Sequence, residues 1–107
     1  MARVVSIATD LMLSSRVEEG LRAAGHEVVT VGAVAGAPLE GAEAIVADLD
    51  AADAEALAAT GLPVLGYYSH VDVDTKARAE AAGLAQVVPR SRMSRELPDL
   101  VAALLVR

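Results

Sequence analysis

The sequence contains no cysteine, tryptophan or phenylalanine, and its only aromatic residues are Tyr67 and Tyr68. Without cysteine there can be no disulfide, no thiolate zinc site and no cysteine nucleophile. Two tyrosines offer too few stacking platforms for nucleic-acid bases or a flavin ring. The core must therefore be aliphatic, and any chemistry must come from carboxylates, hydroxyls, imidazoles and basic side chains.

Positive charge is also scarce. The chain has 9 lysine and arginine residues against 15 acidic ones, a formal net charge of −6 at pH 7. Because binding to nucleic-acid phosphates needs a surplus of positive charge, we expect no nucleic-acid partner. The apolar runs are too short for a signal peptide or a membrane-spanning segment, so we expect a cytoplasmic protein with no membrane role.

The length of 107 residues and a hydrophobic content of 54% suit one self-contained core. We expect a single domain over residues 1–107 with no attached output domain, because the regular pattern continues to the last helix.

Short apolar runs alternate with helical patterns along the chain. The runs predict five strands, over residues 3–8, 26–31, 43–48, 63–68 and 85–88. Helical spacing predicts helices over 13–24, 51–60 and 73–82, and a last one near the end of the chain, each of the first three followed by a glycine. The segment 32–42 is rich in glycine, so a helix there is short or absent. Ser94 is expected to cap the last helix, with Pro98 in its first turn.

This alternation predicts an α/β fold. Strands joined through helices form a parallel sheet with right-handed crossovers and a layer of helices on each face, a three-layer α/β/α sandwich. For five strands the flavodoxin-like order 2-1-3-4-5 is the expected one, and ligands gather at the carboxyl ends of its strands.

Polar residues follow several of the predicted strands. They are Thr9, Asp10, Asp48, Asp50, Ser69, His70 and Arg90. Such a set fits phosphoryl transfer, in which one carboxylate accepts the phosphoryl group, other acids hold Mg²⁺, and a hydroxyl and a cation bind the phosphoryl oxygens. Structural roles are open as well: Thr9 or Asp10 capping the first helix, Asp50 as an acid in the first turn of the helix 51–60, and Asp48 capping a turn or pairing with Arg90.

Four segments together resemble the response-regulator receiver family, in order and spacing, over essentially the full length. They are "RVVSIATDLMLSSRVEEGLRAAGHEVVTV", "EAIVADLD", "LPVLGYYSH" and "AEAAGLAQVVPRS". The resemblance implies a signalling domain with Asp48 in the phospho-acceptor position. If Mg²⁺ is bound, Asp10, Asp48 and Asp50 are its candidate ligands. The resemblance also implies a contact or dimer face on the family's fourth and fifth helices and fifth strand.

Several chemical positions depart from the family pattern. The acidic pair after the first strand falls on Ala8 and Thr9, the hydroxyl after the fourth strand on Tyr68, and the lysine of the lysine-proline pair on Arg90. Mg²⁺ prefers near-ideal octahedral oxygen geometry, and arginine does not reproduce the point charge of lysine. The departures predict a degenerate receiver, or pseudo-receiver.

Three functional hypotheses follow. The leading one is a stand-alone signalling module, not an enzyme and without a cofactor, that binds another signalling protein or itself as a homodimer and lacks efficient phosphotransfer. The first alternative is a Mg²⁺-dependent receiver phosphorylated on Asp48. The second is a small-anion or small-molecule binding module that uses the crevice at the strand ends, with Thr9, Ser69, His70 and Arg90 as candidate binding residues.

Overall fold

The computed structural model describes residues 2–69 and 73–106. His70, one of the predicted site residues, lies outside the described residues. The strands are β1 (Arg3–Ile7), β2 (Glu27–Val31), β3 (Ala44–Asp48), β4 (Val64–Tyr68) and β5 (Gln86–Pro89). The helices are α1 (Leu11–Ala23), α2 (Ala54–Ala58), α3 (Val73–Ala81) and α4 (Arg90–Leu105).

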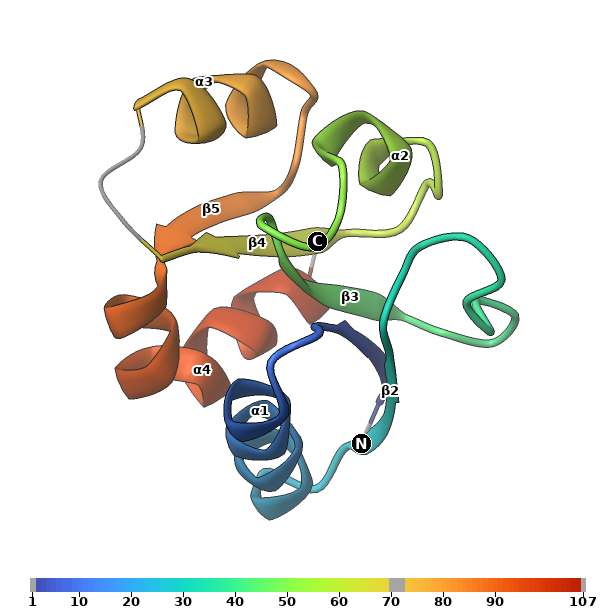
Figure 1. Cartoon of the computed structure of the whole chain (residues 1–107). Helices are drawn as coiled ribbons and strands as arrows, with labels where there is room; N and C mark the ends of the chain where they lie inside the picture. Colours follow the sequence, from blue (N-terminus) through green and yellow to red (C-terminus); the bar gives the residue numbers. More distant parts are fainter. Residues whose placement is uncertain (1, 70–72, 107) are drawn as a thin grey trace.

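All five strands are parallel and lie in the order β2-β1-β3-β4-β5. Helices α1 and α4 cover one face of the sheet and α2 and α3 the other (Figure 1). The predicted three-layer α/β fold and its strand order 2-1-3-4-5 are confirmed.

The burial of each strand follows its place in the sheet. Every residue of β3 and β4 is buried, because both strands are central and covered on both faces. On the edge strand β2, Val28 is buried while Glu27 and Val29 on either side are exposed. The continuous apolar runs that predicted β3 and β4 therefore reflect burial on two sides.

No helix lies between β2 and β3; residues 32–43 connect the two strands as a loop. Val34 and Leu39 from this loop pack against the core beneath α2 and α3. The predicted loss or shortening of a helix here is confirmed, and two apolar side chains take over part of its covering role.

Three predicted helix stops are confirmed. Gly25, Gly61 and Gly83 follow α1, α2 and α3 with φ angles of 92°, 76° and 89°. This left-handed conformation is open to glycine without a Cβ penalty, so the glycines end the helices at these points.

The predicted start of the last helix is wrong. Helix α4 begins at Arg90 directly after β5, its N-cap residue is Pro89, and Ser94 and Pro98 both lie inside it. Pro98 has no N–H for the carbonyl of Ser94, which ordinarily weakens a helix. Packing overrides this preference, because the helix buries side chains on both sides of the proline: Met93, Leu97, Leu100, Val101 and Leu104.

Candidate functional site

The carboxylate of Asp48 is buried at the carboxyl end of β3, with the residue only 3% exposed. Its Oδ1 accepts a hydrogen bond of 2.9 Å from the backbone N–H of Asp50, which closes the turn after the strand. Loss of hydration on burial raises the pKa of the Asp48 carboxyl above its usual range, and the nearby charge of Asp50 adds to this rise. The group is thus held in a setting that disfavours its anionic form.

Arg90 supplies the cation that faces Asp48. As the first residue of α4, it places Nη2 3.9 Å from Asp48 Oδ2. This distance allows an ion pair but is too long for a hydrogen bond. The Nε of Arg90 is buried and has no hydrogen-bond partner among the described residues. The pairing of Asp48 with Arg90, and the turn closed by Asp48, are confirmed as structural roles.

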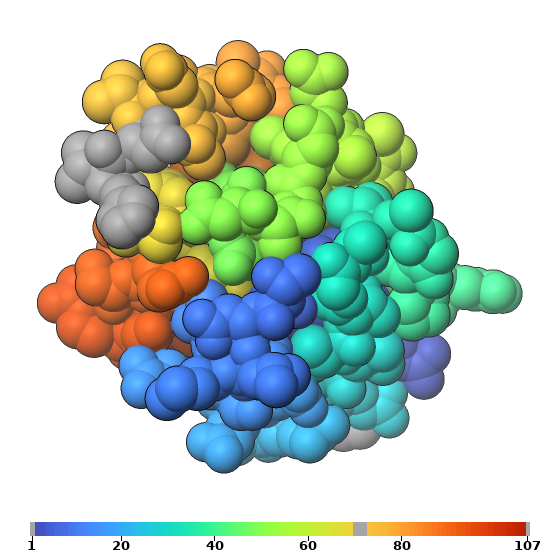
Figure 2. All heavy atoms as spheres, viewed as in Figure 1, coloured from blue at the N-terminus to red at the C-terminus, as the bar shows by residue number. Residues whose placement is uncertain are grey.

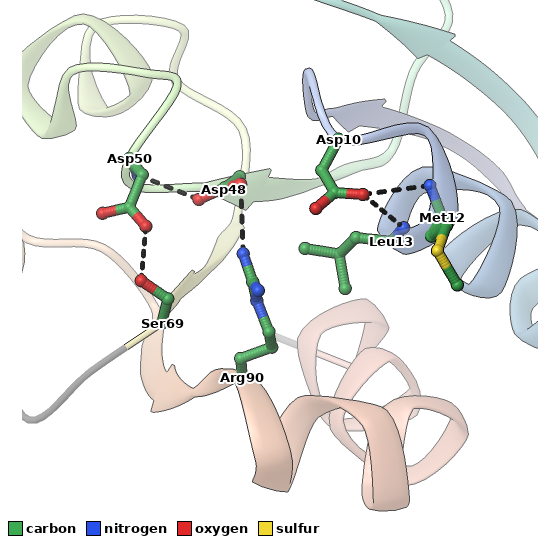
Figure 3. Close-up of polar contacts among 7 residues, drawn as sticks. All are labelled: Asp10, Met12, Leu13, Asp48, Asp50, Ser69 and Arg90. Atoms are coloured by element: carbon green, nitrogen blue, oxygen red, sulfur yellow. Dashed lines mark hydrogen bonds and ion pairs between the residues drawn. The ribbon is translucent and has the colours of Figure 1, made fainter.

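Asp10 is turned toward the first helix. Its Oδ1 accepts hydrogen bonds from the backbone N–H groups of Met12 (3.0 Å) and Leu13 (3.1 Å), so it is the N-cap of α1 (Figure 3). Such caps satisfy amide groups that have no partner within the helix. Of the two capping candidates, Asp10 takes the role, and Thr9 is exposed beside it.

Asp50 is linked to Ser69 at the end of β4. The Ser69 hydroxyl donates a 2.7 Å hydrogen bond to Asp50 Oδ2. The expectation that Asp50 lies in the first turn of a helix is wrong, because α2 begins only at Ala54 and is capped by Asp53, whose Oδ2 accepts from the N–H of Ala56. Residues 49–51 form a turn instead, and the Asp50 side chain reaches across to β4.

The contacts form one connected chain of groups: Ser69 to Asp50, Asp50 to Asp48, and Asp48 to Arg90 (Figure 3). Asp10 lies near enough to affect the pKa of Asp48, but its hydrogen bonds go to α1. Within residues 2–69 and 73–106, no group of three or more acidic or histidine side chains is arranged to hold a metal ion. What the arrangement does chemically is to balance the charge of Asp48 with a cation from the chain itself.

The sequence did not identify Tyr67 as a neighbour of Asp48. This residue pairs with Asp48 in the register of β3 and β4, so both side chains leave the sheet on the same face. Tyr67 is fully buried, and its hydroxyl has no hydrogen-bond partner in the described part of the chain. Burial, and secondarily the charge of Asp48, raise the pKa of the Tyr67 phenol. The register of β3 and β4 makes the two residues neighbours, and the sequence alone does not provide that register.

Arg16 was also missed. It lines a hollow of about 180 Å³ between α1 and α4, whose wall consists of Asp10, Met12, Leu13, Arg16, Arg90 and Ser94. Arg16 lies four residues after Met12, one helical turn further along α1, and that spacing was the available signal.

Comparisons with known proteins bear on the fold. No protein-family model and no curated protein sequence matches the chain. Solved structures do match. A response regulator receiver domain protein from Clostridium thermocellum has a TM-score of 0.86 at 14% identity, with 100% of this chain and 96% of that chain covered.

Two further receiver structures agree. A CheY-like receiver domain protein from Methanospirillum hungatei has a TM-score of 0.82 at 15% identity, covering 99% of this chain and 94% of that one. The chemotaxis response regulator CheY4 of Vibrio cholerae has a TM-score of 0.81 at 18% identity, covering 98% and 99%. The chain therefore has the fold of response-regulator receiver domains, and the resemblance seen in its sequence is confirmed at the level of the fold.

Proposed function

We propose that this protein is a receiver-like signalling module that acts by protein–protein interaction and does not use Asp48 for efficient phosphotransfer. The observation that carries the proposal is the state of the Asp48 carboxylate. One oxygen accepts a hydrogen bond from the N–H of Asp50, the other faces Arg90 at 3.9 Å, and Asp48 itself is only 3% exposed.

Phosphorylation of a carboxylate needs an exposed anion and positive charge that gathers the incoming oxygens. Burial disfavours the anion of Asp48, and the one cation facing it in the described structure is an arginine fixed at the start of α4. Asp10, the acid that follows β1 and could ligate a metal, uses one carboxylate oxygen to accept hydrogen bonds from two backbone N–H groups of α1. These features favour a protein that has the receiver fold and acts by binding a partner protein.

We propose a single receiver-like domain over residues 1–107 that is not an enzyme, works in the cytoplasm, and has another signalling protein or a second copy of itself as its partner. Among the described residues, none of the helices has the length and apolar character needed to cross a membrane.

The test is incubation with a small phosphodonor such as acetyl phosphate and Mg²⁺, read by intact mass. The wild type and Asp48→Ala are compared, with Asp53→Ala as a control that removes another acid from the same loop. We expect no phosphoryl adduct that depends on Asp48. A stable adduct present in the wild type and in Asp53→Ala but missing from Asp48→Ala would establish the Mg²⁺-dependent phospho-acceptor instead.

A further inference from the structure

The strand β2 bonds to β1 through alternate residues. Glu27 donates its N–H to the carbonyl of Ala2 at 2.8 Å, and the carbonyl of Val31 accepts from the N–H of Ala8 at 3.0 Å. Along an extended strand, the backbone N–H and C=O of one residue point to one side and those of the next residue to the other. The residues of β2 whose backbone groups turn to β1 are therefore Glu27, Val29 and Val31.

The backbone groups of Val28 and Thr30 consequently point away from the sheet. β2 is an edge strand, and no hydrogen bond from elsewhere in the described residues reaches these groups. β2 lies at the margin of the sheet (Figure 1), and the teal segment made of β2 and the loop after it forms the right-hand side of the face in Figure 2. An open strand edge of this kind is a template for a further strand.

The edge of β2 lacks the devices that usually protect an exposed strand. Such devices are a very short strand, a proline, a lysine or a bulge. The opposite edge strand, β5, has only four residues and ends on Pro89. The five residues of β2, "EVVTV", include neither proline nor lysine and pair with β1 without a bulge. No helix follows β2, and Val29 remains 38% exposed.

Two copies of β2 match each other in antiparallel pairing about a two-fold axis at Val29. Val28 of each copy then lies opposite Thr30 of the other, and the two residues exchange hydrogen bonds through their outward backbone groups. Val29 meets its own copy in the closer, non-hydrogen-bonded kind of pair, which covers its exposed side chain. Glu27 lies opposite Val31, so no like charges face each other across the two strands.

The charges beside the edge are paired within each copy. Glu27 is the one charged residue of β2, and its carboxylate lies 3.2 Å from Nε of Arg3. On α1, Gly20 faces α4, and Glu18 lies about 200° around the helix from it, on the side toward the edge of β2. Glu18 forms an ion pair of 3.1 Å with Arg22. Neither pair adds net charge to the edge.

Two further acids, Glu40 and Glu43, lie in the loop between β2 and β3. Glu43 accepts a 3.1 Å hydrogen bond from the N–H of Arg3, on the side of β1 that faces β3 and not β2. Each copy as a whole carries a net charge of −6. Repulsion between copies is therefore mainly long-range and is screened by salt, so pairing through this edge should strengthen as the salt concentration rises.

We propose that the outer edge of β2 pairs two copies of this chain into a symmetric dimer with one continuous sheet. The inference rests on the proposed interaction function and assigns it a surface and a partner, a second copy. A strand of another protein can use the same backbone groups, but the match of side chains is specific to the copy. A pair of five-residue strands is small beside a standard interface of about 1,600 Å², so the dissociation constant lies between micromolar and millimolar.

Sedimentation equilibrium of the full-length protein from micromolar to millimolar concentration, at low and high salt, measures the association. Amide hydrogen exchange followed by NMR locates it. The N–H groups of Val28 and Thr30 should gain protection as the concentration rises. The N–H of Val29, which bonds to β1, should be protected at every concentration.

Charge variants at the axis test the pairing directly. Val29→Lys should weaken the dimer at least about tenfold, because it places two like charges in the closest cross-strand pair. An equimolar mixture of Val29→Lys and Val29→Glu should recover the dimer, a result that misfolding cannot produce. Val73→Lys makes the same change on α3, where Val73 is 71% exposed, and should alter association less than about twofold.

A proline variant tests the outward hydrogen bonds. Thr30→Pro removes an N–H that β1 does not use, and proline is tolerated on edge strands, so it should weaken the dimer without unfolding the chain. Thr30→Ala keeps that N–H and should leave association unchanged. Circular dichroism of each variant checks its fold, and the mixture of the two Val29 variants decides if Thr30→Pro is unfolded.

The dimer is overturned by a chain that stays monomeric at millimolar concentration, by growth beyond a dimer, or by a dimer that Val29→Lys and Thr30→Pro leave intact. A monomeric chain in which Val28 and Thr30 gain protection only from an added extended valine-threonine peptide would assign the edge to another protein. A phosphoryl adduct that depends on Asp48 would overturn the proposed function and leave the association result standing, and a monomeric chain would overturn the dimer alone.

Discussion

The carboxylate of Asp48 and the guanidinium of Arg90 face each other at 3.9 Å, which joins the end of β3 to the first turn of α4. The pair links the buried acid at the carboxyl edge of the sheet to α4. Because Asp48 is almost entirely removed from water, the energetics of the pair are dominated by burial and not by attraction between the two charges.

Replacement of Asp48 by asparagine should stabilise the fold at neutral pH. Burial raises the folded-state pKa of Asp48 above its unfolded value. The stability that this group contributes is therefore fully present below the unfolded pKa and is lost as pH rises through the folded pKa. Asparagine keeps an acceptor for the Asp50 N–H and carries no charge. We expect Asp48→Asn to raise the free energy of unfolding at pH 7 by about 0.5–2 kcal/mol, the usual range for a single stabilising substitution.

Urea denaturation at pH 7 and near pH 4 measures this effect. The advantage of Asp48→Asn should shrink at the lower pH, where the wild-type carboxyl takes up its proton. Asp99→Asn, which removes an exposed acid of α4, should change stability by less than about 0.5 kcal/mol at pH 7. A destabilised Asp48→Asn at pH 7 would mean that the attraction of Arg90 outweighs the cost of burial.

Asp10→Ala should lower the free energy of unfolding by about 0.5–2 kcal/mol, because it removes the acceptor of two N–H groups at the start of α1. Asp10→Asn retains a side-chain oxygen that can cap the helix and should stay close to the wild type. Urea denaturation in the presence and absence of Mg²⁺ separates capping from metal binding. Equal losses for both variants, appearing only with Mg²⁺ present, would assign Asp10 to a metal site.

Gly66→Ala should destabilise the protein by about 1–3 kcal/mol. A Cβ at position 66 would lie 2.9 Å from Cδ2 of Leu49, the residue that directly follows Asp48. The double variant Gly66→Ala with Leu49→Ala relieves that clash, so its loss should be smaller than the sum of the two single losses. Gly32→Ala, where an added Cβ meets nothing within 4 Å, is the matched control. Thermal unfolding of the four proteins decides between strain at Leu49 and simple loss of a glycine.

Tyr67→Phe should leave stability unchanged or raise it. The Tyr67 hydroxyl is buried and has no hydrogen-bond partner among the described residues, so removing it ends an unfavourable desolvation of about 1–3 kcal/mol. Tyr67→Ala should instead cost about 3–5 kcal/mol, because it empties a fully buried position of the core. Chemical denaturation provides both values. A clear loss in Tyr67→Phe would reveal a polar partner of the hydroxyl, such as a bound water molecule.

The order of elements could be predicted from the sequence alone. Continuous apolar runs such as residues 43–48 predicted central strands, and the glycines after each of the first three helices predicted where those helices end. These features are local: periodicity of side chains and the backbone freedom of glycine act within a few residues. Parallel strand order followed from the alternation of strands and helices, because crossovers allow few solutions.

What the sequence could not decide was how the polar residues are shared between competing partners. Asp10 was a candidate metal ligand and is the N-cap of α1. Asp50 was expected in the first turn of a helix and instead accepts a hydrogen bond from Ser69 at the end of β4. Ser94 and Pro98 had the pattern of a helix start and lie within α4, because burial of its apolar face outweighs the local preference of proline. The contact between Asp48 and Arg90 joins residues 42 positions apart. Only tertiary packing sets such a distance, and with it the charge balance on which the proposed function depends.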